Sequence, residues 1–314
     1  MPKILINDGI HASGLKKLEE AGFEVDNTKI AQEDLINRLP QYDAICVRSA
    51  TKVREALIAA CPNLKVIGRG GVGLDNIDVD FAKDKGIAVI NTPAASSRSV
   101  AELAFAHLLS VARFLYKSNR HMPKDGSTEF KALKKSYSKG FELKGKTLGV
   151  IGLGRIGQET VKIGLGMGMK VVGVDPFAKD VKVEVNVADQ TLEVAVTQVQ
   201  MDDMLAQADI ISLHIPFTGE AVLSGREFSK MKDGVILINA SRGGTVDEEA
   251  LLAALNDDKV AAAGLDVFEN EPTPREELLQ HPNVSCTPHI GAATNEAQEN
   301  IGIELADKLI SALS

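Results

Sequence analysis

The sequence predicts an α/β protein that folds as two doubly wound parallel-sheet domains. Short apolar runs alternate with segments of helical periodicity along almost the whole chain, a pattern typical of parallel strands joined by crossover helices. The 314 residues exceed the usual size of a single hydrophobic core. A glycine turn of the kind that opens a doubly wound sheet begins only at Gly152, so a complete α/β unit has room to precede it.

The first third of the chain is expected to form one small sheet. Its candidate strands are the runs KILI, FEV, DAICV, LKVIG and IAVIN, and segments such as LKKLEEAG and EALIAAC separate them. From Ser99 to Arg120, apolar residues recur at helical spacing, which predicts one long amphipathic helix that bridges two domains. Residues 121–140 mix glycine, lysine and polar residues without a period, and we expect an arm or loop there.

A second α/β series begins at the run TLGVIGLGRIG. Its further strands are predicted at KVVGVD, ADIISLHI, GVILINA and VAAAGLDVF. The last stretch, NEAQENIGIELADKLISAL, has the period of an amphipathic helix but no evident place in the second sheet. We therefore expect it to return to the first sheet.

Composition and charge argue against several classes of function. The net charge of −8 disfavours general nucleic-acid binding, which needs a basic surface to neutralise phosphates. The three cysteines are odd in number and lack close CxxC spacing, which indicates neither a disulfide framework nor a thiolate metal site and favours a reducing compartment. The sequence has neither an apolar signal core nor a run of about eighteen apolar residues, so we expect a cytoplasmic protein without membrane contact.

The turn GLGRIG has the spacing of a dinucleotide-binding loop. Gly152 permits the tight turn, Gly154 lets a pyrophosphate approach the backbone, and Gly157 allows close packing of helix and strand. The next strand, KVVGVD, ends in Asp175, where a carboxylate accepts hydrogen bonds from ribose hydroxyls and repels a 2′-phosphate. This favours NAD over NADP. The alternative is that Asp175 only begins a turn with Pro176.

Three polar side chains follow predicted strands of the second sheet, at the edge where ligands bind in open α/β sheets. They are Arg242 in ASRGG, Glu271 in ENEP and His289 in TPHIG. Arginine offers a fork that matches a carboxylate, histidine exchanges a proton near neutral pH, and a glutamate bonded to the imidazole orients it. Together these types suffice to oxidise a 2-hydroxy acid, although each alone is also compatible with a structural role.

The other histidines are assigned to packing, to the cleft or to the surface. His107 lies on the long helix and is expected to pack, whereas His214, at a strand end before Pro216, is expected to contribute to the cleft. Surface positions are expected for the remaining three, His11, His121 and His281. Because no second histidine or carboxylate has the spacing of a metal ligand, no metal site is predicted.

Several motifs in one order extend these expectations. The series GLGRIG, LHIPFT, INASRGGTVDEEALLAAL, GLDVFENEP and CTPHIGAAT resembles the D-2-hydroxyacid dehydrogenase family across nearly the whole chain. The resemblance implies that Arg242 binds the substrate carboxylate, that His289 is the acid/base and that Glu271 supports His289.

The same resemblance implies a domain plan and cofactor contacts. A Rossmann domain that binds NAD covers residues 99–289, and it is inserted into a flavodoxin-like substrate-binding domain of residues 1–98 and 290–314. A homodimer formed through the cofactor domain is also implied. Besides the glycine loop and Asp175, cofactor contacts are expected from Arg155, Ile156, Ile215, Pro216, Ala240, Asp266 and Gly291.

Within the first domain, VRSATKV and GRGGVGLDNID resemble the D-3-phosphoglycerate dehydrogenase branch, in a short form without a C-terminal regulatory domain. The resemblance implies oxidation of D-3-phosphoglycerate to 3-phosphohydroxypyruvate in serine biosynthesis. A phosphate needs cations besides Arg242, and we expect one or both of Arg48 and Arg69 to hold it. The turn from Gly71 through Val72 to Gly73 is expected to offer backbone donors to the carboxylate. Two roles stay open for the lysines of the arm: they extend this basic pocket, or they form a solvated face, which is the more common role of such a run. They are Lys131, Lys134, Lys135 and Lys139.

Two alternatives stay open. The first is another enzyme of the family, namely a glyoxylate/hydroxypyruvate reductase or a different D-2-hydroxyacid dehydrogenase. The second, from another class, is an NAD(H)-sensing corepressor-like interaction protein, which has the same fold and the same motifs. The sequence offers no disordered extension or basic recruitment segment outside the two domains to favour the second.

Overall fold

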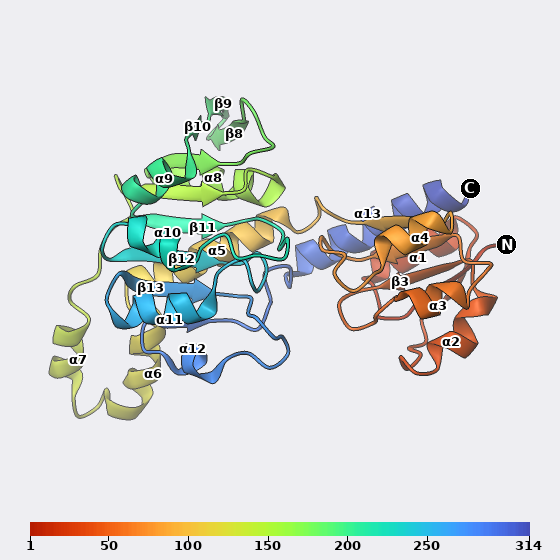
Figure 1. Cartoon of the computed structure of the whole chain (residues 1–314), viewed down its shortest axis with the longest axis horizontal. Helices are drawn as coiled ribbons and strands as arrows, with labels where there is room; N and C mark the ends of the chain where they lie inside the picture. The colour runs from red at the N-terminus through yellow and green to blue at the C-terminus, as the bar shows by residue number, and fades with distance from the viewer. The chain divides into compact units, whose positions relative to one another are not determined.

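The computed structural model describes residues 1–314, which separate into two compact units. Unit 1 consists of Met1–Ser99 and Ala292–Ser314, and unit 2 of Val100–Gly291. Each unit is built on its own parallel sheet with helices on both faces (Figure 1). The predicted fold class, two doubly wound α/β sheets with one inserted into the other in sequence, is confirmed.

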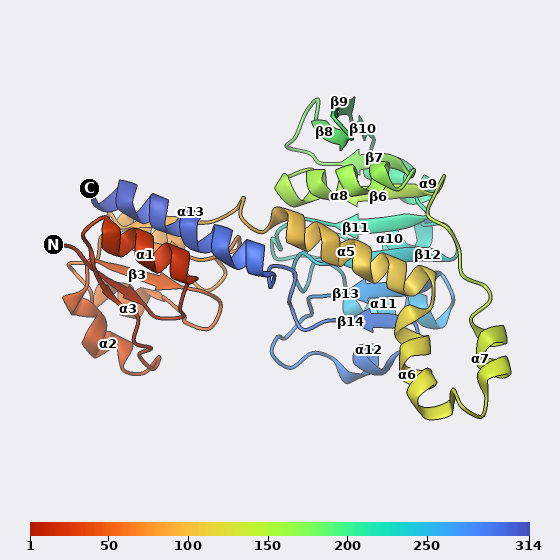
Figure 2. The same cartoon turned by 180° about the vertical axis from the view of Figure 1, so that it is seen from behind.

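Unit 1 contains a five-stranded parallel sheet in the order β2-β1-β3-β4-β5. Its strands are β1 Lys3–Ile6, β2 Glu24–Asp26, β3 Ala44–Val47, β4 Val66–Arg69 and β5 Ala88–Asn91. Its helices are α1 Ala12–Glu20, α2 Leu35–Arg38, η1 Leu39–Gln41, α3 Glu55–Ala59, α4 Val79–Asp84 and α13 Asn295–Leu313. Figures 1 and 2 show α1 and α13 on one face and α2, α3 and α4 on the other. The inner strands β1, β3 and β4 are therefore buried on both faces, which is why they read as continuous apolar runs.

The two helices on one face of unit 1 meet backbone to backbone. A Cβ atom added at Gly14 of α1 would lie 2.5 Å from the carbonyl oxygen of Gly302 in α13. Only glycine at position 14 allows this approach, and α13 then covers Ile4, Ile6 and Val66 of the sheet. The C-terminal helix is thus part of the core of unit 1.

Unit 2 contains a seven-stranded parallel sheet in the order β10-β7-β6-β11-β12-β13-β14. Its strands are β6 Thr147–Ile151, β7 Lys170–Val174, β10 Thr197–Gln198, β11 Ile210–Leu213, β12 Val235–Asn239, β13 Val260–Leu265 and β14 Val284–Cys286. Its helices are α5 Ser97–Ala112, α6 Leu115–Asp125, α7 Phe130–Ser136, α8 Arg155–Gly166, α9 Met201–Gln207, α10 Gly225–Lys230, α11 Glu248–Asn256 and α12 Glu276–Gln280. Helices α5 and α8 cover one face (Figure 2), and α9 to α12 cover the other.

The expectation of one helix from Ser99 to Arg120 is wrong. Helix α5 ends at Ala112, and Phe114 takes a left-handed conformation with φ of 53°, so α6 starts in a new direction, bent by 58°. The predicted arm at residues 121–140 is also partly helical, since it holds the end of α6 and all of α7. No single helix is both long and apolar enough to cross a bilayer, and α5 and α6 reach that length only if counted together across their bend.

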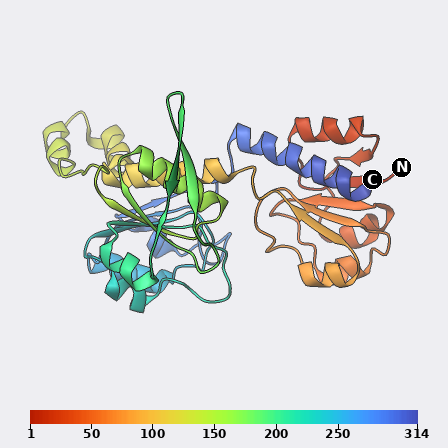
Figure 3. The ribbon, with the colours of Figure 1, turned by 90° about the horizontal axis from the view of Figure 1, so that it is seen from above.

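A β-hairpin takes the place of a crossover helix between β7 and β10. Strands β8 Lys182–Val187 and β9 Gln190–Ala195 pair antiparallel and project from unit 2 as the narrow green loop in Figure 3. Val183 and Val194 stand opposite each other and pack with the core on the α8 side. Sequence reasoning missed this strand, although the alternation in KVEVNV has the period of two that is typical of strands.

Candidate active site

The polar residues of unit 2 gather at the carboxyl edge of its sheet. The order of the strands reverses between β6 and β11, which is the point where open parallel sheets bind ligands. The glycine loop follows β6, His214 follows β11, Arg242 follows β12 and His289 follows β14. Segments far apart in the sequence are thereby brought to one edge.

Each glycine of the loop meets a different steric demand. Gly152 has φ of 92°, and a Cβ there would lie 2.5 Å from the carbonyl oxygen of His214. A Cβ at Gly157 would lie 1.9 Å from the carbonyl oxygen of Gly152, so the helix packs directly on the turn. A Cβ at Gly154 would meet nothing within 4 Å and would instead fill the open space before the first turn of α8. Unpaired N–H groups of that turn attract anions, so the loop fits the pyrophosphate of a dinucleotide.

Asp175, at the end of β7, supports the glycine loop. Its Oδ2 accepts the N–H of Leu153 at 2.8 Å, and its Oδ1 accepts the N–H groups of Phe177 at 2.8 Å and Ala178 at 3.1 Å. The carboxylate therefore organises both the loop and the turn at Pro176. Since each carboxylate oxygen accepts two hydrogen bonds, one oxygen retains capacity for a ribose hydroxyl.

His214 does not present its ring to the site. Its Nε2 contacts Ser212 Oγ at 2.9 Å and Thr160 Oγ1 at 3.0 Å, which joins α8 to β11. The ring is buried, and this burial lowers the pKa of His214 to about 3. The prediction that His214 contributes to the cleft is therefore wrong for its side chain, because the neutral ring serves internal packing.

Glu271 and His289 form a direct pair. His289 Nδ1 lies 2.8 Å from Glu271 Oε2, and the two side chains are 47% and 36% exposed. Burial raises the pKa of Glu271, but the hydrogen bond and charge of His289, the N–H of Phe268 and the charge of Arg242 outweigh burial and lower that pKa below its usual value. The ionised Glu271 thus accepts the Nδ1 proton, and Nε2 of the imidazole is left for chemistry.

The loop that carries Arg242 and the loop that carries Glu271 are in direct contact. Glu248, 5% exposed at the start of α11, accepts the N–H of Glu269 through Oε1 at 2.7 Å. A Cβ at Gly243 would lie 1.9 Å from the carbonyl oxygen of Phe268, so the two loops touch along their backbones. Burial and the neighbouring carboxylate of Glu269 raise the pKa of Glu248. Sequence reasoning missed Glu248, because its partner is a backbone amide about twenty residues away.

Two more predicted cofactor residues lie inside this edge. Ala240 is 7% exposed directly after β12. Asp266, 1% exposed after β13, accepts the N–H of Ile290 through Oδ1 and the N–H of Gly291 through Oδ2, each at 2.8 Å. Its carboxylate therefore shapes the loop around His289, and the N–H of Gly291 is already bonded there.

The predicted substrate residues of unit 1 lie at the carboxyl ends of β3 and β4. The backbone N–H of Arg48 donates to Asp8 Oδ2 at 2.7 Å. The N–H of Gly71 donates to Thr92 Oγ1 at 2.8 Å, which corrects the expectation that Gly71 offers its donor to a substrate carboxylate. In this turn only the later N–H groups, from Val72 onward, are left for that role.

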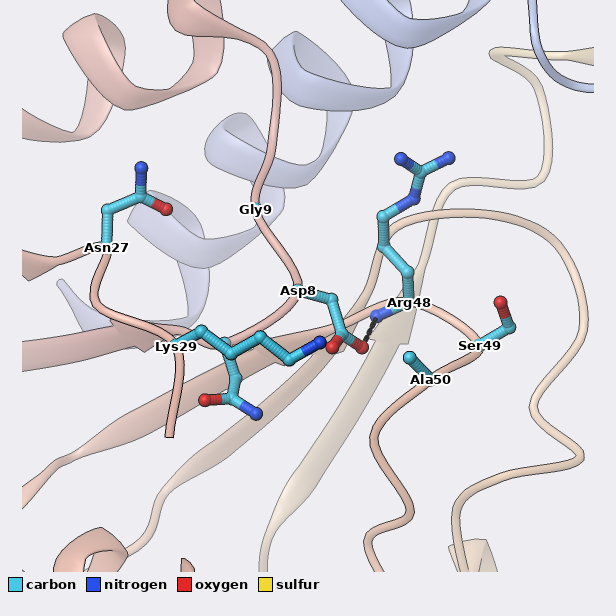
Figure 4. A pocket seen from close by; sticks show the side chains of 8 residues that line it. Asp8, Gly9, Asn27, Lys29, Arg48, Ser49 and Ala50 are labelled. Carbon is cyan, nitrogen blue, oxygen red and sulfur yellow. Dashed lines mark hydrogen bonds between the residues drawn. The ribbon is translucent and has the colours of Figure 1, made fainter. Parts of the chain in front are cut away.

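Unit 1 also has a pocket of about 460 Å³ at the carboxyl ends of β1, β2 and β3. Figure 4 shows the Lys29 ammonium directed toward Asp8, while the Arg48 guanidinium extends away from it. The remaining lining residues are Asn7, Gly9, Asn27, Ser49 and Ala50. Sequence reasoning missed Lys29, since it follows a three-residue strand without any motif.

Known proteins with similar sequences and structures fit this arrangement. Residues 105–291 match the family described as D-isomer specific 2-hydroxyacid dehydrogenase, NAD binding domain. The hydroxypyruvate reductase of Thermotoga maritima is 44% identical over 317 residues, which cover 99% of this chain and 98% of that protein. The D-3-phosphoglycerate dehydrogenase of Archaeoglobus fulgidus is 44% identical over 313 residues, which cover 98% of this chain and only 57% of that protein.

Solved structures agree with this result. A glyoxylate reductase from Paecilomyes thermophila superposes with a TM-score of 0.83 at 30% identity, covering 99% of this chain and 95% of that one. The TT0316 protein from Thermus thermophilus superposes with a TM-score of 0.85 at 30% identity, covering 99% of this chain and 96% of that one.

Proposed function

Because the chain belongs to the D-isomer specific 2-hydroxyacid dehydrogenase family and is an NAD-dependent dehydrogenase, we propose that it oxidises D-3-phosphoglycerate to 3-phosphohydroxypyruvate. This reaction would place it in serine biosynthesis. The observation that carries the catalytic part of the proposal is the 2.8 Å pair of His289 and Glu271. The charge of Arg242 contributes to the lowered pKa of Glu271.

Each residue of the triad has a separate task in the proposed reaction. His289 Nε2 accepts the proton of the substrate hydroxyl, and Glu271 stabilises the imidazolium that forms. Arg242 binds the substrate carboxylate with its guanidinium fork and fixes the reacting carbon. NAD, when bound, supplies the acceptor for the hydride that leaves this carbon. In the reverse direction, His289 returns the proton to the ketone.

We assign the cofactor to the carboxyl edge of unit 2. The loop of Gly152, Gly154 and Gly157 receives the pyrophosphate, and Asp175 binds the adenosine ribose and disfavours a 2′-phosphate. Proposed contacts with the rest of the cofactor come from Arg155, Ile156, Ile215, Pro216, Ala240, Asp266 and Gly291.

Unit 1 supplies the proposed recognition of the phosphate. Arg48 and Arg69 both lie at carboxyl ends of parallel strands, where cations meet ligands. Lys29 lines the same pocket as Arg48, and its ammonium is directed toward Asp8. A phosphorylated substrate carries more negative charge than an unphosphorylated hydroxy acid, so these cations should favour the former.

Reduction of hydroxypyruvate or glyoxylate is the second candidate. It is favoured by the relative from Thermotoga maritima, which matches over almost its entire length and is a hydroxypyruvate reductase. The two candidates use the same triad and differ only in what unit 1 must bind.

A substrate panel distinguishes the candidates. The rate of NAD reduction with D-3-phosphoglycerate should exceed that with D-glycerate or D-lactate at equal concentration, and the rate with NADP should be lower than with NAD. His289→Ala should lower kcat by about 100-fold or more while NADH affinity stays near that of the parent protein. Higher efficiency with hydroxypyruvate or glyoxylate would favour the second candidate, and tight NADH binding without turnover of any substrate would favour an NADH-sensing interaction protein.

The phosphate assignment needs its own comparison. The double variant Arg48→Ala/Arg69→Ala should lose most of the preference for D-3-phosphoglycerate over D-glycerate through a higher KM. Lys52→Ala removes an exposed cation from the segment that follows Arg48 and serves as the matched control, with its preference unchanged. Unaltered discrimination in the double variant would contradict the role of both arginines.

We also propose that the enzyme is a cytoplasmic homodimer that pairs through unit 2. The arm of α6 and α7 exposes Leu115, Met122 and Phe130, which are 60%, 43% and 57% exposed. Light scattering should give twice the mass of 33.5 kDa, and charged substitutions at Leu115 and Phe130 should give the single mass.

A further inference from the structure

His107 is a buried histidine that the proposed mechanism does not use. It lies on α5, is 3% exposed and rests on β13, where a Cβ at Gly264 would come within 2.5 Å of its own Cβ. Both ring nitrogens have partners: Nδ1 lies 3.0 Å from Ser285 Oγ, and Nε2 lies 2.8 Å from Thr287 Oγ1. Burial requires a partner for each nitrogen, so the role of His107 depends on where these hydrogen bonds lead.

The direction of these hydrogen bonds follows from Thr287. Its hydroxyl donates to Asp266 Oδ1 at 2.6 Å, and both oxygens of this carboxyl group also accept backbone N–H groups. A hydroxyl has one proton, so Thr287 Oγ1 must accept from His107 Nε2. Burial lowers the pKa of His107, which keeps the ring neutral, and Nδ1 then accepts the proton of Ser285. The tautomer of His107 is therefore fixed with its proton on Nε2.

The chain of hydrogen bonds ends at the loop that carries His289. Asp266 Oδ1 also accepts the N–H of Ile290, and Oδ2 accepts the N–H of Gly291, each at 2.8 Å. Thr287 and Ile290 flank His289, whose φ of 55° is left-handed. Such a backbone persists in a residue with a side chain only where its surroundings hold it.

We propose that His107 is a positioning residue for His289, acting through the hydroxyl of Thr287 and the carboxylate of Asp266. The Nε2–H of His107 donates to Thr287 Oγ1, and the hydroxyl proton of Thr287 is then donated to Asp266. Asp266 in turn fixes the two backbone amides that follow His289. This inference rests on the proposed acid/base role of His289, and it adds a buried second histidine about 180 residues earlier in the chain.

The test compares three variants of the full-length protein. His107→Leu fills the space but removes both ring nitrogens, so kcat should fall by about 10-fold to 100-fold, since a small misplacement of a reacting group has this effect. The substrate KM should change by less than about threefold, since no group proposed to bind the substrate is removed. His107→Gln can donate to Thr287 and accept from Ser285, and it should recover most of kcat. Ser285→Ala removes only the hydroxyl that donates to Nδ1 and is the control, with kcat near that of the parent.

The outcomes separate the possible failures. Parent-like kcat in His107→Leu, or equal loss in the leucine and glutamine variants at equal thermal stability, would overturn the positioning role. If His289→Ala retains full activity, the proposed function itself fails. Should His107→Leu not fold, ¹⁵N NMR of the parent protein decides: a neutral ring with the Nε2–H tautomer at pH 7 to 8 supports the inference, and an Nδ1–H tautomer or a protonated ring at that pH overturns it.

Discussion

At His289 the backbone itself is under constraint. Its left-handed φ of 55° costs a residue with a side chain about 1 kcal/mol, and the hydrogen bonds of Asp266 on both sides offset this cost. The imidazole is thereby aimed at Glu271 rather than left to sample several orientations. A reactive group is more effective when its geometry is set before the substrate arrives.

At Tyr42 a hydrogen bond makes the stability of unit 1 depend on pH. The buried hydroxyl donates to Asp26 Oδ2 at 2.5 Å. This bond lowers the pKa of Asp26, while burial and the same bond raise the pKa of Tyr42 to about 12. Because the pKa of Asp26 is lower in the folded protein, the pair stabilises the fold at pH values above the pKa of Asp26 in the unfolded chain. This stabilisation is lost as the pH falls through the pKa of the folded state. Because the pKa of Tyr42 is higher in the folded protein, its hydroxyl stabilises the fold at pH values below the pKa of Tyr42 in the unfolded chain. This stabilisation is lost as the pH rises toward about 12.

Tyr42→Phe should therefore destabilise the protein most at neutral pH. We expect a loss of about 1 kcal/mol in the free energy of unfolding at pH 7 and a clearly smaller loss near pH 3, where Asp26 is protonated in the unfolded chain. Urea denaturation at both pH values measures the difference. An equal loss at the two pH values would mean that the hydroxyl contributes by packing and not through the charge of Asp26.

At this scale, the sequence predicted residue types better than their partners. Arg242, Glu271 and His289 were singled out by chemistry and spacing, and Glu271 and His289 are in contact at 2.8 Å. The error at His214 and the correction at Gly71 have one physical origin. Whether a ring faces a site or an amide is already bonded depends on neighbours such as Thr160 and Thr92, which are distant in the chain.

At the scale of elements, two glycines at the start of α8 have different roles, one in cofactor binding and one in folding. A Cβ at Gly154 meets open space, whereas a Cβ at Gly157 overlaps the carbonyl oxygen of Gly152 at 1.9 Å. We predict that Gly154→Ala keeps the thermal midpoint of the parent while the NADH Kd rises by about 10-fold or more, since the methyl group occupies the space expected for the pyrophosphate.

Gly157→Ala is the matched comparison on the same helix. It should lower the free energy of unfolding by about 1 to 3 kcal/mol, because the helix must move off the turn. Differential scanning fluorimetry and NADH fluorescence titration measure both effects. If the two variants lose stability equally, or if Gly154→Ala binds NADH like the parent, the open space before α8 is not the pyrophosphate site.

Two elements escaped prediction for identifiable reasons. The break between α5 and α6 falls at Phe114, with no glycine or proline between Ser99 and Arg120 to signal it. Periodicity continues across the bend, so the pattern alone indicates one helix. The β8–β9 hairpin takes the place of a crossover helix in the repeating strand–helix pattern. Its alternation of valine with polar residues is a short signal, and the repeated crossover pattern on both sides favours a helix there.

At the scale of the whole molecule, the two units have separate hydrophobic cores. Clusters in unit 1 draw on β1, β3 and β4, and those in unit 2 on β6, β11, β12 and β13. This division could be predicted from chain length, because a single core stops growing at about this size, and from the late position of the glycine loop, which leaves room for a complete unit before it. The boundaries in the structure, at Ser99 and Gly291, fall outside the apolar runs: Ser99 ends the polar stretch SSRS, and Gly291 lies in the loop that follows β14.

The separate cores lead to a prediction for NADH binding without substrate. NADH at about 100 times its Kd should stabilise unit 2 by about 2.7 kcal/mol, which slows the most protected amides there by about 100-fold. Amides in β1, β3 and β4 of unit 1 should be unaffected. Hydrogen exchange with mass spectrometry of the full chain resolves the two units. Equal slowing in both would contradict the assignment of the cofactor to unit 2 alone.

The contribution of α13 to the core of unit 1 has a consequence during translation. About 190 residues separate the two segments of this unit, so at roughly 5 to 20 residues per second the ribosome needs roughly 10 to 40 s to deliver the second one. Throughout this interval the nascent β1, β3 and β4 lack the leucines, Leu305 and Leu309, that cover one of their faces. Chaperones that bind nascent apolar segments therefore find their target in the part of the protein that is made first.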